Sequence, residues 1–315
     1  EDFPLERTSR FIPDGDATQV AARICECLRQ RSVQATYNSQ KAKAKCIAME
    51  NVKFRIQLFA SENGGLMVEV QRRRGDGFAF MRECRAVLSA AEGGGEIEDE
   101  PAGLGRVANL ECIKDVIKSY QPDIIRELER VDTMLADPNE DSTLHALGHL
   151  RDMTDPVKSS ADIIEIVSRR VFDRSFDTCR HLLIILDSGA RDTIQKSDEG
   201  NNLAIYRHQL VLNVMANAFS VLQKLDELSE ICKEERIRDS VISILLDQVR
   251  VGRLYPHISV FAIQCISSLA SNSDIHKLLL EKNVLSYLKE AVDFGSETHD
   301  KLGKVAANTL LQCSC

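Results

Sequence analysis

The chain has 315 residues, of which 43% are hydrophobic and 28% charged, and its formal net charge is −8. No run approaches 18 consecutive apolar residues, which excludes a membrane-spanning helix, and the first residues lack the basic and apolar segments of a secretory signal. Because most of its ten cysteines stand singly within amphipathic segments, we expect free thiols and a cytoplasmic protein.

The first hundred residues predict an α+β module, since their hydrophobic period changes between that of a helix and that of a strand. A helix is expected from Asp16, which can cap it, to Leu28. Alternating residues then predict an antiparallel sheet, and a second helix starts after Gly75-Asp76-Gly77. The expected strands span 33–37, 41–47, 52–58 and 66–71, with a turn at 63–65.

Alternation places cationic side chains on one face of this sheet, because successive side chains of a strand point to opposite faces. The cations on that face are Lys41, Lys43, Lys45, Lys53, Arg55 and Arg73, and Arg72 and Arg74 lie beside them. A gathering of this kind favours a surface that binds anions. The alternative is that these side chains keep an exposed face solvated and protect sheet edges from aggregation.

The order of elements over about residues 14–91 resembles the kinase-associated C-terminal domain of AMP-activated-kinase relatives and microtubule-affinity-regulating kinases. The most specific part is the strand Val52–Leu58 followed by Gly65–Phe80 and a closing amphipathic helix. The family's basic, Gly-Asp and aromatic positions are held here by Arg72, Arg73, Gly75, Asp76 and Phe78. The resemblance implies that the eight cations bind head groups of anionic phospholipids, and that the module folds back on a kinase domain. In that family the domain usually closes the chain, whereas a large helical region follows here.

The composition changes between Glu92 and Pro101, where Gly93–Gly95 is followed by acidic residues. Glycines, like charges and a proline are typical of a solvated linker. We therefore predict a basic module over 1–92, a linker over 93–106 and a helical repeat domain over 107–315. Residues 1–92 carry a net charge of +3, and the remaining residues carry −11.

Beyond the linker the apolar spacing is helical, and ten or more helices with short connections favour stacked repeats over one bundle. Val260–Ala270 resembles the third helix of an armadillo repeat, and the pattern returns at Ala306–Cys313. This predicts an all-α armadillo-like solenoid, in which Asp155-Pro156 starts one helix. The expected helices span 107–119, 123–136, 141–150, 157–170, 172–186, 205–225, 237–251, 256–270, 275–281, 285–292 and 299–312.

In armadillo proteins an Asn of the third helix lines a concave groove and holds extended peptides. The resemblance implies that the equivalent residues here, His149, Asn217, Ser268 and Gln312, bind a protein partner; among them only Asn217 keeps the family's residue. The charge of −11 favours a basic partner segment. The alternative is that the helical domain is a rigid spacer.

No catalytic or metal-binding constellation is recognisable in the sequence. The chain lacks the Gly-rich phosphate loops, the nucleophile elbow and the zinc motif with two histidines and a glutamate. His145 and His149 stand four residues apart on a predicted helix, but no third ligand is evident. We therefore expect no catalytic residue, no metal and no cofactor.

These observations predict a non-enzymatic adaptor or scaffold that associates peripherally with a membrane. Its basic sheet face is expected to bind anionic phospholipids, and its helical repeats to bind a protein, either a kinase or a basic peptide segment. The alternative is a docking or regulatory module of a kinase that binds proteins alone. Nucleic acid is disfavoured, because no aromatic residues are interleaved with the cations and the sequence pI is about 5.5.

Overall fold

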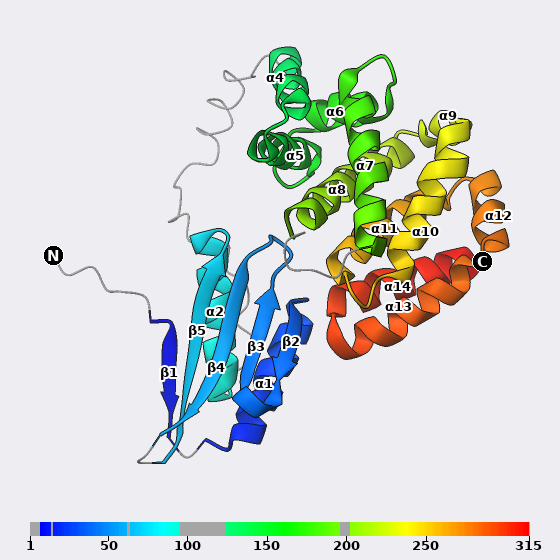
Figure 1. The fold of residues 1–315 in the computed structure, drawn as a ribbon. Helices are drawn as coiled ribbons and strands as arrows, with labels where there is room; N and C mark the ends of the chain where they lie inside the picture. Colours follow the sequence, from blue (N-terminus) through cyan, green and yellow to red (C-terminus); the bar gives the residue numbers. More distant parts are fainter. Residues whose placement is uncertain (1–6, 14, 62–63, 95–123, 196–201, 315) are drawn as a thin grey trace. The chain divides into compact units, whose positions relative to one another are not determined.

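The computed structural model describes residues 7–13, 15–61, 64–94, 124–195 and 202–314 of the chain (Figure 1). The chain divides into two compact units. The first comprises residues 1–109 with 295–301, and the second comprises residues 110–294 with 302–315. The predicted helix at 107–119, the predicted linker from residue 95 onward and Asn63 of the predicted turn lie outside the described residues.

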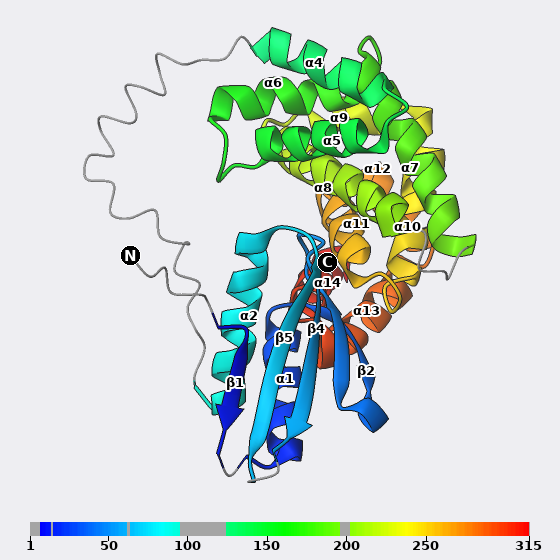
Figure 2. The ribbon, with the colours of Figure 1, turned by 60° about the vertical axis from the view of Figure 1, so that its left-hand side comes forward.

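The first unit is built on a five-stranded antiparallel sheet with the strand order β1-β5-β4-β3-β2, which Figure 1 labels in full and Figure 2 shows from another side. Four strands confirm the predicted sheet. The fifth, β1, is too short to be recognised from alternation, and it pairs with β5 at the edge. The strands are β1 (Ser9–Ile12), β2 (Gln34–Asn38), β3 (Lys43–Ile47), β4 (Lys53–Ala60) and β5 (Leu66–Arg74).

Two helices, α1 (Ala17–Gln30) and α2 (Gly77–Glu92), pack against each other and cover one face of the sheet, behind the strands in Figure 1. Both begin where predicted. The side chains of Asp16 and Asp76 accept hydrogen bonds from backbone N–H groups of the first helical turns. Their apolar faces close an aliphatic core over the sheet, and Phe54 contributes an aromatic ring to it.

Strand β3 begins later than predicted, which changes the position of Lys41. Residues Ser39–Lys41 form a 3-10 turn, and the Asn38 side chain accepts a hydrogen bond from the Lys41 backbone N–H at 3.0 Å. Ala42 follows in the left-handed region with φ of 43°, so regular alternation starts only at Lys43. The prediction that Lys41 lies in a strand is therefore wrong.

The other described helices belong wholly or mostly to the second unit. Among them α8 packs against α5, α6, α7 and α11, and the Phe172 and Phe219 rings stack with centroids 4.3 Å apart. No helix in the described part of the chain combines the length and the apolar character that crossing a bilayer requires. The helices are α4 (Ile124–Ala136), α5 (Glu140–Thr154), α6 (Ala161–Phe172), α7 (Asp177–Gln195), α8 (Asn202–Lys224), α9 (Leu228–Cys232), α10 (Ile242–Arg250), α11 (Pro256–Leu269), α12 (Ser273–Glu281), α13 (Val284–Thr298) and α14 (Asp300–Ser314), with a π-helical turn, Ile237–Val241, before α10.

Most predicted helices in the described residues are confirmed, but several of their boundaries differ; the helix expected at 285–292, for example, is Val284–Thr298. Asp155 ends α5 instead of starting the next helix, and α6 begins only after Ser160. Phe172 is the last residue of α6, not the first of α7. The carboxylate of Asp173 accepts hydrogen bonds from the backbone N–H and hydroxyl of Ser175, at 2.9 and 2.7 Å, and this local turn delays α7.

Candidate functional site

The face of the sheet opposite α1 and α2, here called the outer face, carries most of the predicted cations. Ala44 and Ile56 are buried on the helix side, so their neighbours along the strands point outward. Lys45 on β3 lies directly opposite Arg55 on β4. Lys43, two residues before Lys45, shares this face.

Arg73 and Arg74 reach the outer face at the end of β5, where the pairing with β4 is interrupted by a bulge. Arg74 lies opposite Lys53, and Arg73 is the extra residue of the bulge. Arg73 Nη2 donates a hydrogen bond to Gln71 Oε1 at 2.7 Å, and Gln71 lies opposite Arg55. Arg73 is thereby held near Arg55.

Arg72 does not belong to the outer face. It lies opposite Phe54, whose ring is buried under the helices, so its side chain leaves the sheet on the helix side. Arg72 Nη1 donates a hydrogen bond to the backbone oxygen of Gly75 at 3.0 Å. The structure thus gives Arg72 a contact within the turn before α2 and separates it from the other predicted cations.

The charges on the outer face are close enough to perturb one another. We call Lys41, Lys43, Lys45, Arg55 and Arg73 the cationic patch. The pKa of Lys43 lies below its usual value, because its ammonium loses hydration and because the other four cations repel it. Like charges directly opposite on a sheet, as Lys45 and Arg55 are, destabilise strand pairing. Arg55 Nε is buried without a hydrogen-bond partner among the described residues. Repulsion within the patch therefore opposes folding.

A polar row borders the patch. Glu69 on β5 lies opposite Gln57 on β4 and Ser9 on β1, and Gln57 lies opposite Lys43. Glu69 carries a carboxylate on the outer face, but along β5 it lies two residues from Gln71, the residue opposite Arg55. It is therefore not in the row that contains Lys45 and Arg55. It therefore limits the patch on one side and leaves its centre cationic.

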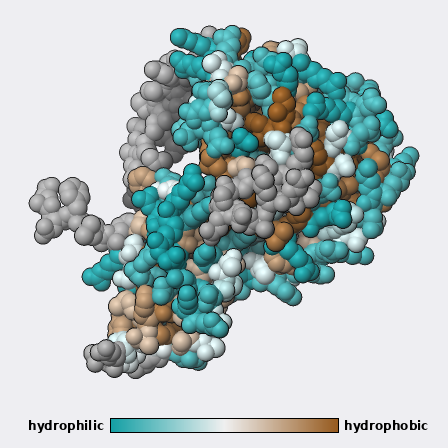
Figure 3. Space-filling view, in the orientation of Figure 1, coloured by the Kyte–Doolittle hydropathy of each residue, from teal (hydrophilic) through white to brown (hydrophobic). Residues whose placement is uncertain are grey.

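Beyond this row the outer face becomes apolar, which the sequence analysis does not predict. Phe11, Phe59 and Met67 lie there, and we call them the apolar strip. Figure 3 shows hydrophobic residues at the lower end of the sheet and hydrophilic residues above them. The sequence contains part of this information, because Phe59 and Met67 continue the alternation of β4 and β5. Phe11 could not be added without knowing that β1 exists.

The predicted protein-binding residues lie on four different helices. His149 on α5 is exposed, whereas Ser268 on α11 is buried, with 6% of its surface accessible. Gln312 on α14 uses its amide within the chain: its Oε1 accepts a hydrogen bond from Ser267 Oγ at 2.7 Å, and its Nε2 donates to the Ser267 backbone oxygen at 2.8 Å. The structure thus places Gln312 next to Ser267, the residue that precedes Ser268.

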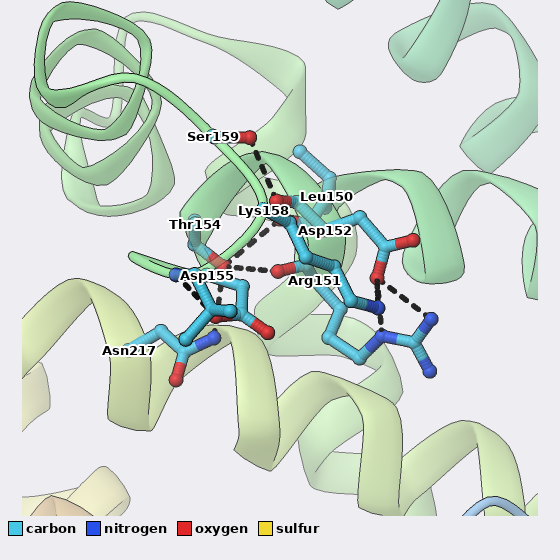
Figure 4. A network of polar contacts seen from close by, with 9 residues as sticks. Leu150, Arg151, Asp152, Thr154, Asp155, Lys158, Ser159 and Asn217 are labelled. Carbon is cyan, nitrogen blue, oxygen red and sulfur yellow. Dashed lines mark hydrogen bonds and ion pairs between the residues drawn. The ribbon is translucent and has the colours of Figure 1, made fainter. Parts of the chain in front are cut away.

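Asn217, on α8, takes part in the packing of α8 against the end of α5 (Figure 4). Its Nδ2 donates a hydrogen bond to Thr154 Oγ1 at 3.3 Å, and the Thr154 hydroxyl lies 2.9 Å from the backbone oxygen of Leu150. Ser159 Oγ donates to the backbone oxygen of Asp152 at 2.8 Å, which holds the turn after α5. The amide of Asn217 is therefore already engaged in an internal contact.

Among the described residues, no group of three His, Cys, Asp or Glu side chains is placed to hold a metal ion. His145 and His149 are both exposed on α5. Several cysteines are buried and free, as predicted, although Cys112 lies outside the described residues. Burial raises the pKa of Cys84 to about 11, so its thiol stays protonated at neutral pH and is a poor nucleophile.

Comparisons with known proteins give no match. No family model matches the chain, and searches of curated proteins and of solved structures find no significant similarity. The resemblances to a kinase-associated domain and to armadillo repeats therefore stay predictions. The outer face of the sheet and the charge of the helical unit are the observations that bear on function.

Proposed function

We propose that this chain is a non-enzymatic adaptor that binds anionic phospholipid membrane through the cationic patch and protein partners through its helical unit. The observation that carries the proposal is Lys45 directly opposite Arg55, with Lys43 and Arg73 close by. This crowding of like charge destabilises the sheet. Binding to an anionic surface would offset this repulsion, and we propose that it brings the protein peripherally to a membrane.

The strength of such binding is limited. Each Lys or Arg near an anionic bilayer contributes about 1 kcal/mol. The patch has five cations and Glu69 offsets one of them, so it supplies about 4 kcal/mol at most. That free energy corresponds to binding near the millimolar range. A second contact, with lipid or with a protein, is therefore needed for stable recruitment.

The helical unit supports the second half of the proposal through its charge. Its residues, 110–294 with 302–315, hold 23 Lys+Arg and 30 Asp+Glu, a net charge of −7 that is complementary to a basic segment of a partner. We propose that its helices stack as armadillo-like repeats. The support is the recurring sequence pattern in α11 and α14, together with the contact between Ser267 and Gln312 at nearly equivalent positions of these helices.

A second candidate function is docking on a kinase or another protein without lipid. The observation that favours it is Phe78, which is 86% exposed in the first turn of α2. Exposed aromatic side chains often anchor protein interfaces. Under this alternative the cations of the sheet serve only solubility, and vesicles of any composition leave the chain unbound.

The test is co-sedimentation of the full chain with vesicles of neutral or anionic lipid at low and physiological salt. The patch variant carries Lys43→Glu, Arg55→Glu and Arg73→Glu. The matched control makes the same change in net charge at exposed lysines of the helical unit, through Lys224→Glu, Lys277→Glu and Lys289→Glu.

We expect the wild type and the control to bind anionic vesicles, more strongly at low salt, and the patch variant to stay in solution. Equal binding to neutral and anionic vesicles contradicts the proposal, and so does an unaffected patch variant. Capture of a purified kinase domain by a chain that ignores vesicles supports the second candidate.

A further inference from the structure

The apolar strip runs across three neighbouring strands at one end of the outer face. Phe11 lies directly opposite Met67, and Met67 lies directly opposite Phe59. Side chains directly opposite on a sheet are about 5 Å apart at Cβ, so the three form one continuous surface. Phe11 is 44% exposed and Phe59 is 42% exposed. Single exposed apolar residues are ordinary, whereas a contiguous group of them marks an interaction surface.

The backbone beside the strip is shaped to hold Phe11 in this place. Gly65, just before β5, has a φ of +83°, a conformation that side chains rarely adopt. A Cβ atom at Gly65 would lie 2.9 Å from Phe11 Cζ and 2.7 Å from the backbone oxygen of Ile12. The absence of a side chain at residue 65 therefore lets the Phe11 ring lie across the turn.

The rows of the outer face follow one another in a definite order of polarity. The strip comes first, then the row in which Glu69 and Gln57 lie beside Lys43, and then the centre of the cationic patch at Lys45 and Arg55. The aromatic rings lie at one end of the outer face, and the ammonium and guanidinium groups lie farther along the strands. This order corresponds to the order of layers at a bilayer surface. Rings lie at the boundary of the acyl chains, and cations lie among the phosphates.

A single-stranded nucleic acid fits this order less well. Bases that stack on aromatic rings need those rings distributed along the line of phosphate-binding cations. Here Phe11 and Phe59 stand in one row with Met67 between them, away from Lys45 and Arg55. Charge complementarity and the segregation of the rings therefore favour an anionic lipid surface.

We propose that Phe11, Phe59 and Met67 insert into the interfacial layer of an anionic bilayer while the cationic patch holds its head groups. This inference rests on the proposed function, because the patch must bring the outer face to the membrane. The strip supplies the second contact that the weak binding of the patch requires. It also makes the chain prefer a lipid surface over a soluble anion.

The composition of the chain allows a direct measurement of insertion, because the sequence contains no Trp. Phe59→Trp in the full chain places the only tryptophan of the sequence within the strip. With anionic vesicles we expect its emission to shift to shorter wavelength and to be quenched by lipids brominated on their acyl chains. Heparin, a soluble polyanion, should bind the patch without either change.

The matched reporter is Phe78→Trp, since Phe78 is also exposed but lies at the start of α2, off the strip. Its emission should remain that of a hydrated indole when vesicles bind. If brominated lipids quench Phe78→Trp while the emission of Phe59→Trp stays unshifted, the opposite end of the sheet enters the membrane. This outcome overturns the proposal.

The affinity measurement separates the strip from the patch. The double substitution Phe11→Ser and Phe59→Ser should weaken binding to anionic vesicles by about tenfold or more, since two partly buried rings no longer leave water. Its binding to heparin should be unchanged, as should vesicle binding of Phe78→Ser. The patch variant, in contrast, should lose binding to vesicles and binding to heparin.

Two further outcomes are decisive. If the patch variant loses vesicle binding while Phe59→Trp stays unshifted and the double Ser variant binds normally, insertion is overturned and the proposed function stands. If the wild type binds heparin or an RNA oligonucleotide but no vesicle of any composition, both proposals are overturned.

Discussion

The helical unit and the outer face of the sheet in the first unit arrange their charged side chains differently. In the helical unit, arginines of one segment meet carboxylates of another. Such pairs join Arg170 to Asp132, Arg169 to Glu227 and Arg174 to Glu234. On the outer face of the sheet, Lys45 lies directly opposite another cation, Arg55. Opposite charges attract when the fold brings them together, whereas like charges directly opposite on neighbouring strands destabilise the pairing.

The largest effect is expected where a pair is buried. Arg170 and Asp132 retain little exposed surface and also contact Thr178, which is fully buried. Asp132→Asn keeps the shape but leaves the Arg170 charge without its carboxylate. We expect the free energy of unfolding to fall by about 3 kcal/mol, measured by urea denaturation.

The control for this variant is Glu230→Gln, which breaks a pair with Lys233 in which both side chains are mostly exposed. Exposed pairs contribute little, so its unfolding free energy should change by less than about 1 kcal/mol. Similar losses in the two variants would remove the distinction between structural pairs and solvated charges in the helical unit.

A second effect of comparable size concerns a buried group that is kept neutral. Burial, with a smaller contribution from the charge of Arg207, lowers the pKa of His208 to about 4. An unfolded chain has a histidine pKa of about 6.5. Between these values the unfolded chain binds a proton that the folded chain does not. Stability from this group is therefore complete above pH 6.5 and is lost as the pH falls toward 4.

The loss should be about 3 kcal/mol between pH 7 and pH 4, on top of the contributions of other groups. His208→Leu should flatten that part of the pH dependence in denaturation curves. His145→Leu, which changes an exposed histidine of α5, should leave the curve as in the wild type. If His208→Leu keeps the pH dependence of the wild type, the imidazole of His208 has the same pKa in the folded and the unfolded chain.

The smallest expected effect tests the outer face itself. In a double-mutant cycle, Lys45→Gln and Arg55→Gln should each relieve repulsion, and the coupling between them should be unfavourable by about 0.5 kcal/mol. Thermal unfolding at low salt gives the coupling, and added salt should reduce it. A favourable coupling would mean that the two cations are held together by a contact within the chain.

The cationic side of the sheet could be predicted because alternation is a local property of each strand. Lys43, Lys45 and Arg55 occupy the face that their immediate neighbours assign to them. Lys41 could not be placed, since its position depends on the cap made by the Asn38 side chain and on the left-handed conformation of Ala42. Neither feature changes the pattern of hydrophobic residues.

The apolar strip and the contacts of Asn217 depend on residues far apart in the chain. Phe59 and Met67 become part of a surface with Phe11 only through the pairing of β1 with β5. The position of Asn217 suggested a free groove residue, but its contact with Thr154 arises from the packing of α8 on α5. Periodicity shows which face of an element is apolar, and it does not show which partner that face meets.

The strand order has a consequence for how the outer face is assembled. Strands β2 to β5 form a meander in which each pairs with its sequence neighbour, whereas β1 must pair with β5 across α1 and the intervening strands. Closing that longer loop carries a larger entropic cost, so β1 should dock late in folding. We expect Ile12→Ala to give a kinetic φ-value near zero and Val68→Ala a higher one; the reverse order would contradict this. A partly folded chain would then present most of the cationic patch before the apolar strip is complete.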